Sequence, residues 1–115
     1  MSAENDQARF LKCIAEPTRL RILKLLAGGE KYVGEIIEAL GKEQPLVSHH
    51  LRALKECNIV VARQQAQRIY YELVDTRLAE LVSNVETVIE GVMVPLESSA
   101  LPRARKSRTQ IGEQD

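Results

Sequence analysis

The chain has 115 residues, enough for one compact core but too few for two ordinary domains. Basic and acidic residues balance at 16 each, so net charge alone does not indicate a nucleic-acid partner. No apolar run approaches the roughly 20 residues that cross a bilayer, and the polar, acidic N-terminus is unlike a signal peptide. We therefore expect a cytoplasmic protein with no membrane partner.

Two helices are predicted at the start of the chain. Phe10, Leu11 and Ile14 repeat at helical spacing within residues 8–15. Pro17 is suited to the first position of a second helix, which extends to residue 27 and stops at a Gly-Gly pair. The leucine-rich second helix is expected to be buried on most sides.

The next two helices form a helix-turn-helix. Apolar residues at i, i+3, i+4 and i+7 predict a helix over residues 33–40, which Gly41 ends. Pro45 opens a fourth helix whose apolar stripe includes His50, so we interpret His50 as a core histidine. Two amphipathic helices joined by a short turn containing glycine are typical of this motif.

After the fourth helix, the spacing of apolar residues changes from the helical pattern to the alternation typical of strands. Residues 59–63 are β-branched and residues 69–73 alternate, which predicts two strands around a connection at 64–67. A helix-turn-helix followed by a hairpin is a winged helix. The predicted fold class is therefore mainly α with a small β-hairpin.

Asp75 is the expected N-cap of a long last helix. Its apolar positions step by three and four residues and form a stripe longer than one small domain can cover. We therefore expect a second subunit to cover this stripe, beside the first helix. The domain is predicted to span residues 1–97, with a disordered basic tail over 98–115 that contains Arg103, Arg105, Lys106 and Arg108. The positions of the stripe are Leu78, Val82, Val85, Ile89, Val92 and Leu96.

The polar face of the fourth helix carries the groups that read a DNA major groove. It contains Gln44, Ser48, Arg52 and Lys55, with His49 beside it. Any soluble helix has a polar face, but this one has few carboxylates and precedes a hairpin flanked by cations. In the wing, Arg63 and Arg68 bracket the tip and can reach phosphates or a minor groove. We therefore predict double-stranded DNA as the partner.

Three segments carry a resemblance to a known family. Ala15-Glu-Pro-Thr-Arg-Leu-Arg-Ile-Leu, Gln44-Pro-Leu-Val-Ser-His-His-Leu-Arg-Ala-Leu and Ile69-Tyr-Tyr-Glu-Leu resemble the ArsR (ArsR/SmtB) repressors of prokaryotes, over about residues 10–92. The resemblance implies a homodimer that occupies a palindromic operator and leaves it when a metal ion, metalloid or oxidant arrives.

The effector sites of that family are incomplete here. The Cys-X-Cys motif of the third helix is absent from Tyr32-Val-Gly-Glu-Ile. In the last-helix zinc site Asp75 is present, but Arg77 and Val88 replace the histidines. The wing tip reads Gln64-Gln-Ala-Gln and lacks the glycine of many relatives, which leaves its geometry open. No metal site or cofactor is predicted from these positions.

The two cysteines leave alternatives open. Cys13 and Cys57 are too few for a disulfide framework. They could form a redox pair, bind a soft metal or metalloid together with the other subunit, or pack as small core residues. Cadmium- and lead-sensing relatives also carry a cysteine at the position of Cys57, together with a second cysteine four residues earlier. In this chain that second position is Ala53.

The leading hypothesis is a homodimeric DNA-binding repressor released by a thiol-reactive, redox or metal signal acting as a small effector. The alternatives are a regulator with no such response and a winged-helix module for protein interaction. An enzyme is not expected, because the sequence offers no phosphate loop, metal-ligand cluster or nucleophile-base spacing.

Overall fold

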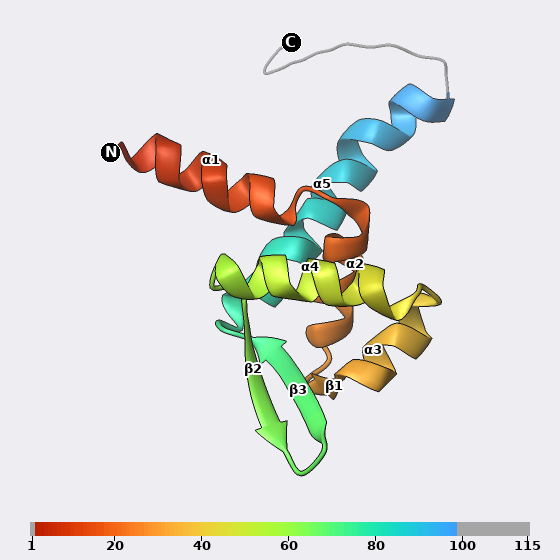
Figure 1. Ribbon diagram of the computed structural model, residues 1–115. Coiled ribbons are helices and arrows are strands. Elements are labelled where there is room, and N and C mark those ends of the chain that lie inside the picture. Colours follow the sequence, from red (N-terminus) through yellow and green to blue (C-terminus); the bar gives the residue numbers. More distant parts are fainter. Residues whose placement is uncertain (1, 99–115) are drawn as a thin grey trace. The chain divides into compact units, whose positions relative to one another are not determined.

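The computed structural model describes the backbone of residues 2–98 and the side chains of residues 2–92. Residues 2–82 form one compact unit, and the part of the last helix beyond residue 82 belongs to a second unit, described by itself. The elements in chain order are α1 (Ala3–Ile14), α2 (Pro17–Leu26), β1 (Lys31–Tyr32), α3 (Val33–Leu40), α4 (Gln44–Glu56), β2 (Val60–Gln65), β3 (Arg68–Leu73) and α5 (Arg77–Ser98) (Figure 1).

Helix α1 begins five residues earlier than its apolar spacing predicts. The Ser2 hydroxyl accepts a hydrogen bond from the Asn5 N–H at 3.0 Å, and Glu4 and Asp6 place negative charge in the first turn. Both features stabilise a helix N-terminus. The expected bounds of α3 are confirmed, and α2 ends within one residue of its predicted end.

The helix-turn-helix consists of α3 and α4. Gly41 joins them with a positive φ of 65°, and its N–H donates to the Ile37 carbonyl, which ends α3. Val47, Leu51 and Leu54 on α4 are at most 1% exposed and pack in the core with Ile22 of α2. This apolar stripe fixes which face of α4 remains outside.

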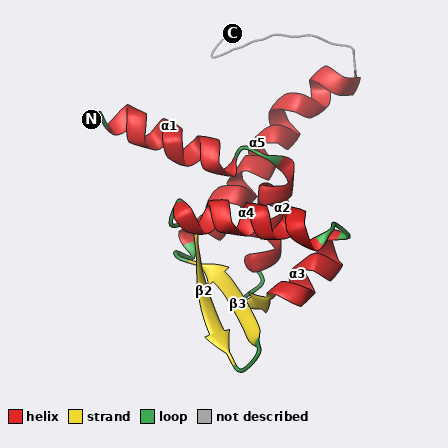
Figure 2. Ribbon diagram, in the orientation of Figure 1, coloured by secondary structure: helices red, strands yellow, loops and turns green. Residues whose placement is uncertain are grey.

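The predicted hairpin is part of a three-stranded antiparallel sheet of order β1-β3-β2 (Figure 2). The third strand, β1, pairs Lys31 with Tyr71 and Tyr32 with Tyr70. The sequence did not indicate it because two residues are too short to show alternation. The strands β2 and β3 extend further than expected and leave only Ala66 and Gln67 between them.

Helix α5 begins at Arg77, so Asp75, the expected N-cap, lies two residues before the first helical residue. The Asp75 carboxylate accepts the backbone N–H of Arg77, the first helical residue, at 2.8 Å. Of the apolar stripe, Leu78 and Val82 are buried within the first unit, whereas Val85, Ile89 and Val92 are exposed in the second. The side chain of Leu96 and the expected tail beyond Ser98 lie outside the described residues.

None of the helices in the described part of the chain combines the length and apolar character needed to span a bilayer.

Candidate nucleic-acid interface

The residues predicted to read DNA lie together on the outer face of α4. Gln44, Arg52 and Lys55 are exposed, and Ser48 is half-buried on the same face. His49 is exposed beside them. Because the opposite face is fixed in the core, the polar face has one defined orientation relative to the rest of the first unit.

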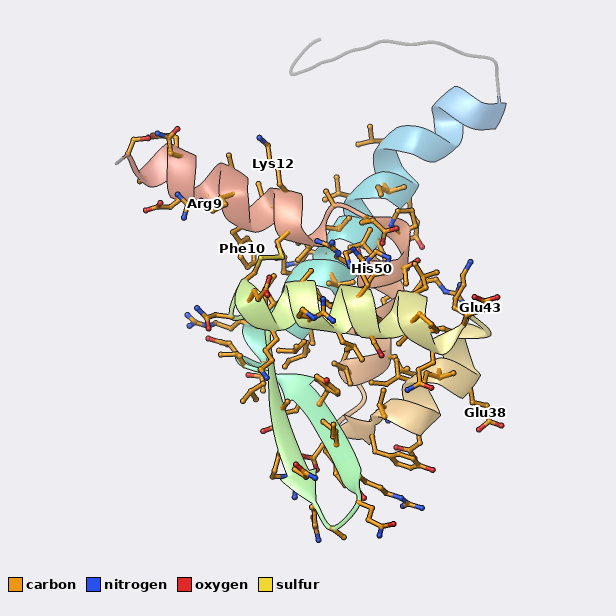
Figure 3. All side chains as sticks on the ribbon, viewed as in Figure 1. Arg9, Phe10, Lys12, Glu38, Glu43 and His50 are labelled. Atoms are coloured by element: carbon orange, nitrogen blue, oxygen red, sulfur yellow. A yellow bond between two sulfur atoms is a disulfide. The ribbon has the colours of Figure 1, made fainter. Side chains whose placement is uncertain are left out.

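His50, next to this face, is a buried and hydrogen-bonded histidine, as predicted. It is 7% exposed, and its Nδ1 accepts from Nε of Arg19 at 3.0 Å. The Glu16 carboxylate lies 3.8 Å from Nε2, too far for a hydrogen bond. Burial, and after it the positive charge of Arg19, holds the pKa of His50 below its ordinary value despite the opposing effect of Glu16. Figure 3 shows His50 at the edge of α4 that lies beside α2.

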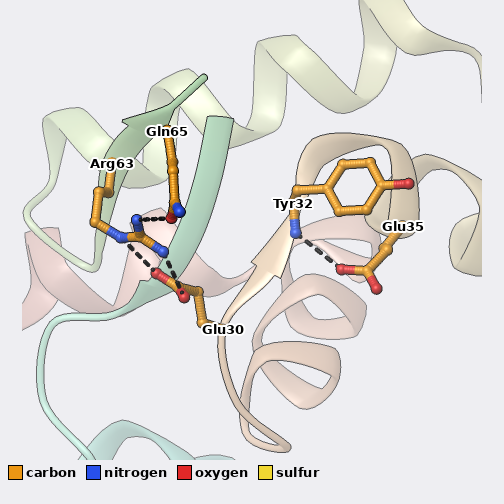
Figure 4. Close-up of polar contacts among 5 residues, drawn as sticks. All are labelled: Glu30, Tyr32, Glu35, Arg63 and Gln65. Carbon is orange, nitrogen blue, oxygen red and sulfur yellow. Dashed lines mark hydrogen bonds and ion pairs between the residues drawn. The ribbon is translucent and has the colours of Figure 1, made fainter. Parts of the chain in front are cut away.

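In the wing, Arg63 is engaged by a neighbour that sequence reasoning missed. Its guanidinium donates to both carboxylate oxygens of Glu30 at 2.8 and 3.1 Å and to Gln65 at 2.6 Å (Figure 4). It also lies 4.8 Å from the centre of the Tyr70 ring. The hydrogen bonds that Arg63 donates to the Glu30 carboxylate raise the pKa of Arg63 above its ordinary value. No sequence signal pointed to Glu30, since it lies 33 residues from Arg63 in the loop before β1.

Arg68, on the other side of the wing tip, stacks on an aromatic pair. Its guanidinium lies 4.2 Å from the centre of the Tyr32 ring, and the rings of Tyr32 and Tyr70 meet edge to face at 5.8 Å. A hydrogen bond to Tyr70 is the main cause of the raised pKa of Arg68. Because Tyr32 belongs to the unpredicted strand β1, this contact could not be foreseen.

The two cysteines lie together as a disulfide between α1 and the C-terminal end of α4. Their Cα atoms are 6.8 Å apart, and 44 positions separate them in sequence. Cys13 is buried in the core, whereas Cys57, the residue that caps α4, is exposed. Core packing therefore accounts for Cys13 but does not account for Cys57.

No metal cluster accompanies the cysteines in the portion of the chain that is described. Within it, no group of three or more histidine, cysteine, aspartate or glutamate side chains is arranged to hold an ion. The Sγ atoms of Cys13 and Cys57 are bonded to each other in this structure.

The recognition helix has one face in the core and a polar face outside. Together with the helix and turn before it and a β-wing that carries cations, it defines a winged helix-turn-helix protein. The model of the arsR family of bacterial regulatory proteins matches residues 16–61. An uncharacterized HTH-type transcriptional regulator of Methanocaldococcus jannaschii is 45% identical over 87 residues, which are 75% of this chain and 98% of that protein. The chain belongs to the arsR family and is a DNA-binding transcriptional regulator.

Two further similarities bear on function. A probable mercury resistance operon repressor of Streptomyces lividans is 41% identical over 75 residues, covering 65% of this chain and 60% of that protein. A solved relative is the homodimeric winged helix-turn-helix DNA-binding domain of a possible ArsR-family regulator from Mycobacterium bovis. It is 36% identical with a TM-score of 0.70, and the match covers 77% of this chain and 82% of that one.

Proposed function

We propose that the protein is a cytoplasmic, homodimeric repressor that binds a palindromic operator through α4 and the wing. The observation that carries the proposal is the polar face of α4, held outward by a stripe that is at most 1% exposed. A recognition helix must present the same side chains to the groove in every molecule, and this packing provides that. The proposal requires no enzymatic step.

Base reading is assigned to the first two turns of α4. A recognition helix contacts base edges mainly with its N-terminal residues, where Gln44 and Ser48 lie. Gln44 has the donor and acceptor pair that matches adenine, and Ser48 can bond to a base or a phosphate. His49 borders this part of the face and adds a further contact.

Positioning on the duplex is assigned to the cations. Arg52 and Lys55, further along α4, are placed to contact phosphates, although Arg52 can also pair with guanine. At the wing tip, Arg63 must first exchange its contact with Glu30 for one with DNA, whereas the guanidinium of Arg68 lies over the Tyr32 ring. Contacts of this kind fix the register without carrying sequence information directly.

Dimerisation is supported by apolar side chains left in solvent on the two helices expected to form the interface. On α1, Leu11 is 52% exposed. On α5, Val85, Val88, Ile89 and Val92 are 37–60% exposed. A repeating apolar stripe on a long helix is the pattern that a partner helix covers. The homodimeric state of the Mycobacterium bovis relative supports the same assignment.

For the effector, we propose an oxidant acting on Cys13 and Cys57. The mercury-related relative would favour a thiophilic metal ion. However, the two thiols form a disulfide, and the described residues supply no further ligands beside them. Oxidation of two neighbouring thiols to a disulfide needs a dissolved oxidant but no further side chain from the protein. A soft metal or metalloid bound with help from the other subunit, and a regulator with no effector, are the competing outcomes of the test.

The test is fluorescence anisotropy on duplex DNA from upstream of the gene, at stated salt, with molar mass measured in parallel by light scattering. We expect a dimer that binds the reduced upstream duplex more tightly than a scrambled one and loses that preference on mild oxidation. Arg52→Gln should weaken binding, and Lys24→Gln, which removes an exposed cation from α2, is the matched control. Specific binding lost only with cadmium, mercury or arsenite would favour the metal alternative. No specific duplex binding would favour an interaction module.

A further inference from the structure

We infer that Cys57 is the thiol that reacts with the oxidant and that Cys13 of the same protomer resolves it, forming one intramolecular disulfide in each subunit. This inference rests on the oxidant control proposed above. It assigns different chemical roles to two residues that the sequence presents as equivalent.

The two cysteines differ in their access to solvent. Cys57 lies at the C-cap of α4 and is exposed, whereas Cys13 is 5% exposed among the core residues of α1 and α4. A dissolved oxidant therefore meets the sulfur of Cys57 first. The reactive form of a thiol is the thiolate, and a negative charge is costly in the apolar surroundings of Cys13. Both arguments make Cys57 the nucleophile.

The chemistry balances with a hydroperoxide as the oxidant. The Cys57 thiolate attacks one oxygen of the hydroperoxide, so that an S–O bond forms, the O–O bond breaks and the leaving oxygen takes up a proton. The Cys13 thiol then attacks the sulfur of the Cys57 sulfenic acid. The S–S bond forms, the S–O bond breaks, and water leaves with the proton of Cys13. Two thiols lose two electrons in total, and the hydroperoxide becomes an alcohol and water.

Backbone contacts place Cys13 beside the last turn of α4, where the second step takes place. The Ala53 carbonyl accepts the N–H of Cys57 at 3.1 Å in the last turn of α4, and the Sγ of Cys13 lies 3.7 Å from the same oxygen. The carbonyl of Cys13 is in turn held by Nη1 of Arg19 at 3.0 Å. In the disulfide-bonded structure, the sulfur of the resolving cysteine therefore lies against the turn that carries its target.

The bond connects an element assigned to the dimer interface with the end of the recognition helix. Because α1 and α4 belong to one protomer, the link changes how the reading helix is held without joining the subunits covalently. Operator binding by a dimer depends on the spacing and angle of two recognition helices. A restraint at one end of each α4 is positioned to alter both.

Single-cysteine variants in the presence of dimedone, which traps sulfenic acid, test this order of reaction. Cys13→Ala retains only Cys57, and Cys57→Ser retains only Cys13. After hydroperoxide treatment of reduced protein, we expect Cys13→Ala to be labelled at Cys57 at least about tenfold faster than Cys57→Ser is labelled at Cys13. Circular dichroism melts of both variants confirm that each is folded under the assay conditions.

The wild-type chain should lose two hydrogens by mass and migrate as a monomer on a non-reducing gel. Equal or faster labelling of Cys57→Ser, or a disulfide-linked dimer of the wild type, would overturn the inference. These readouts use protein without DNA. If oxidation leaves DNA binding unchanged while Cys57 is labelled first, the redox control fails and the assigned order of the thiols still stands.

Discussion

Nε of Arg19 donates a hydrogen bond to Nδ1 of His50 at 3.0 Å and thereby joins α2 to the recognition helix α4. The same guanidinium donates through Nη1 to the Cys13 carbonyl at the end of α1. One side chain thus connects three helices behind the DNA-reading face. Since Nδ1 accepts, the neutral imidazole of His50 carries its proton on Nε2.

This contact predicts a loss of stability on mild acidification. The folded-state pKa of His50 is lowered, first by burial and then by Arg19, so the unfolded chain binds the proton more readily. The contribution of His50 is therefore complete above its unfolded value of 6.5 and is lost as pH falls below that value and through the folded pKa. Urea unfolding between pH 7.5 and 5.5 should show this decline.

His50→Asn is the matched variant for this prediction, because its amide oxygen can accept from Arg19 and does not titrate. Its stability should change less over the same pH range. Glu16 and Asp75 have lowered pKa values, about 2 for Asp75, so their contributions are lost only at more acidic pH. An unchanged pH dependence in His50→Asn would show that another group is responsible.

Reduction of the Cys13–Cys57 disulfide should lower the free energy of unfolding. A cross-link between residues 44 apart restricts the unfolded chain, and loops of this size correspond to about 2–4 kcal/mol. Chemical denaturation of oxidised and reduced protein measures the difference. The Cys57→Ser protein is the control, because a reductant should leave its midpoint unchanged. Equal midpoints for oxidised and reduced wild type would contradict the expectation.

The wing tip should be stabilised by glycine at one position. Ala66 has a φ of 56°, in the left-handed region where a Cβ costs about 1 kcal/mol or more. Ala66→Gly removes that cost but gives the unfolded chain more freedom, so we expect a net gain of about 0.5 kcal/mol. Gln64→Gly, inside β2, should be destabilising by about 0.5–1 kcal/mol. A lower urea midpoint for Ala66→Gly would show that the turn is not strained there.

Glu30 should limit the contribution of Arg63 to DNA binding. Glu30→Gln removes the charge that holds the guanidinium, so we expect affinity for duplex DNA to rise roughly two- to fivefold at low salt. Adding Arg63→Gln to this variant should abolish the gain. Anisotropy titrations at several salt concentrations measure both effects. A gain that survives the second substitution would mean that Glu30 acts by general repulsion of DNA.

The spacing of apolar residues was sufficient to predict the helices and the face of α4 that is exposed. The apolar stripe with Val47, Leu51 and Leu54 fixed the orientation of α4, and so indicated which side chains would be exposed. Contacts between segments far apart in the sequence could not be predicted from this spacing. The pairing of Tyr32 with Tyr70 and the contact of Glu30 with Arg63 depend on a two-residue strand and a loop that carry no periodic signal.

The cysteines illustrate the same limit. Their residue type allowed a redox pair, a soft-metal site or core packing, and neither spacing nor composition could decide whether residues 44 positions apart meet. Their proximity follows from the packing of α1 against α4. The exposure of Cys57 depends on where α4 ends, and helix ends are less sharply specified by sequence than helix faces.

Selection of binding sites from a random duplex library, with wild type and Gln44→Ala compared, tests most directly whether α4 reads DNA. For the reduced wild type we expect a palindrome whose half-sites are centred about 10–10.5 base pairs apart, or a multiple of that. Gln44→Ala should lose preference at one symmetric pair of positions and retain the rest of the site. No enriched palindrome, or an identical site for both proteins and for Arg52→Gln, would contradict the assignment of α4 as the reading helix.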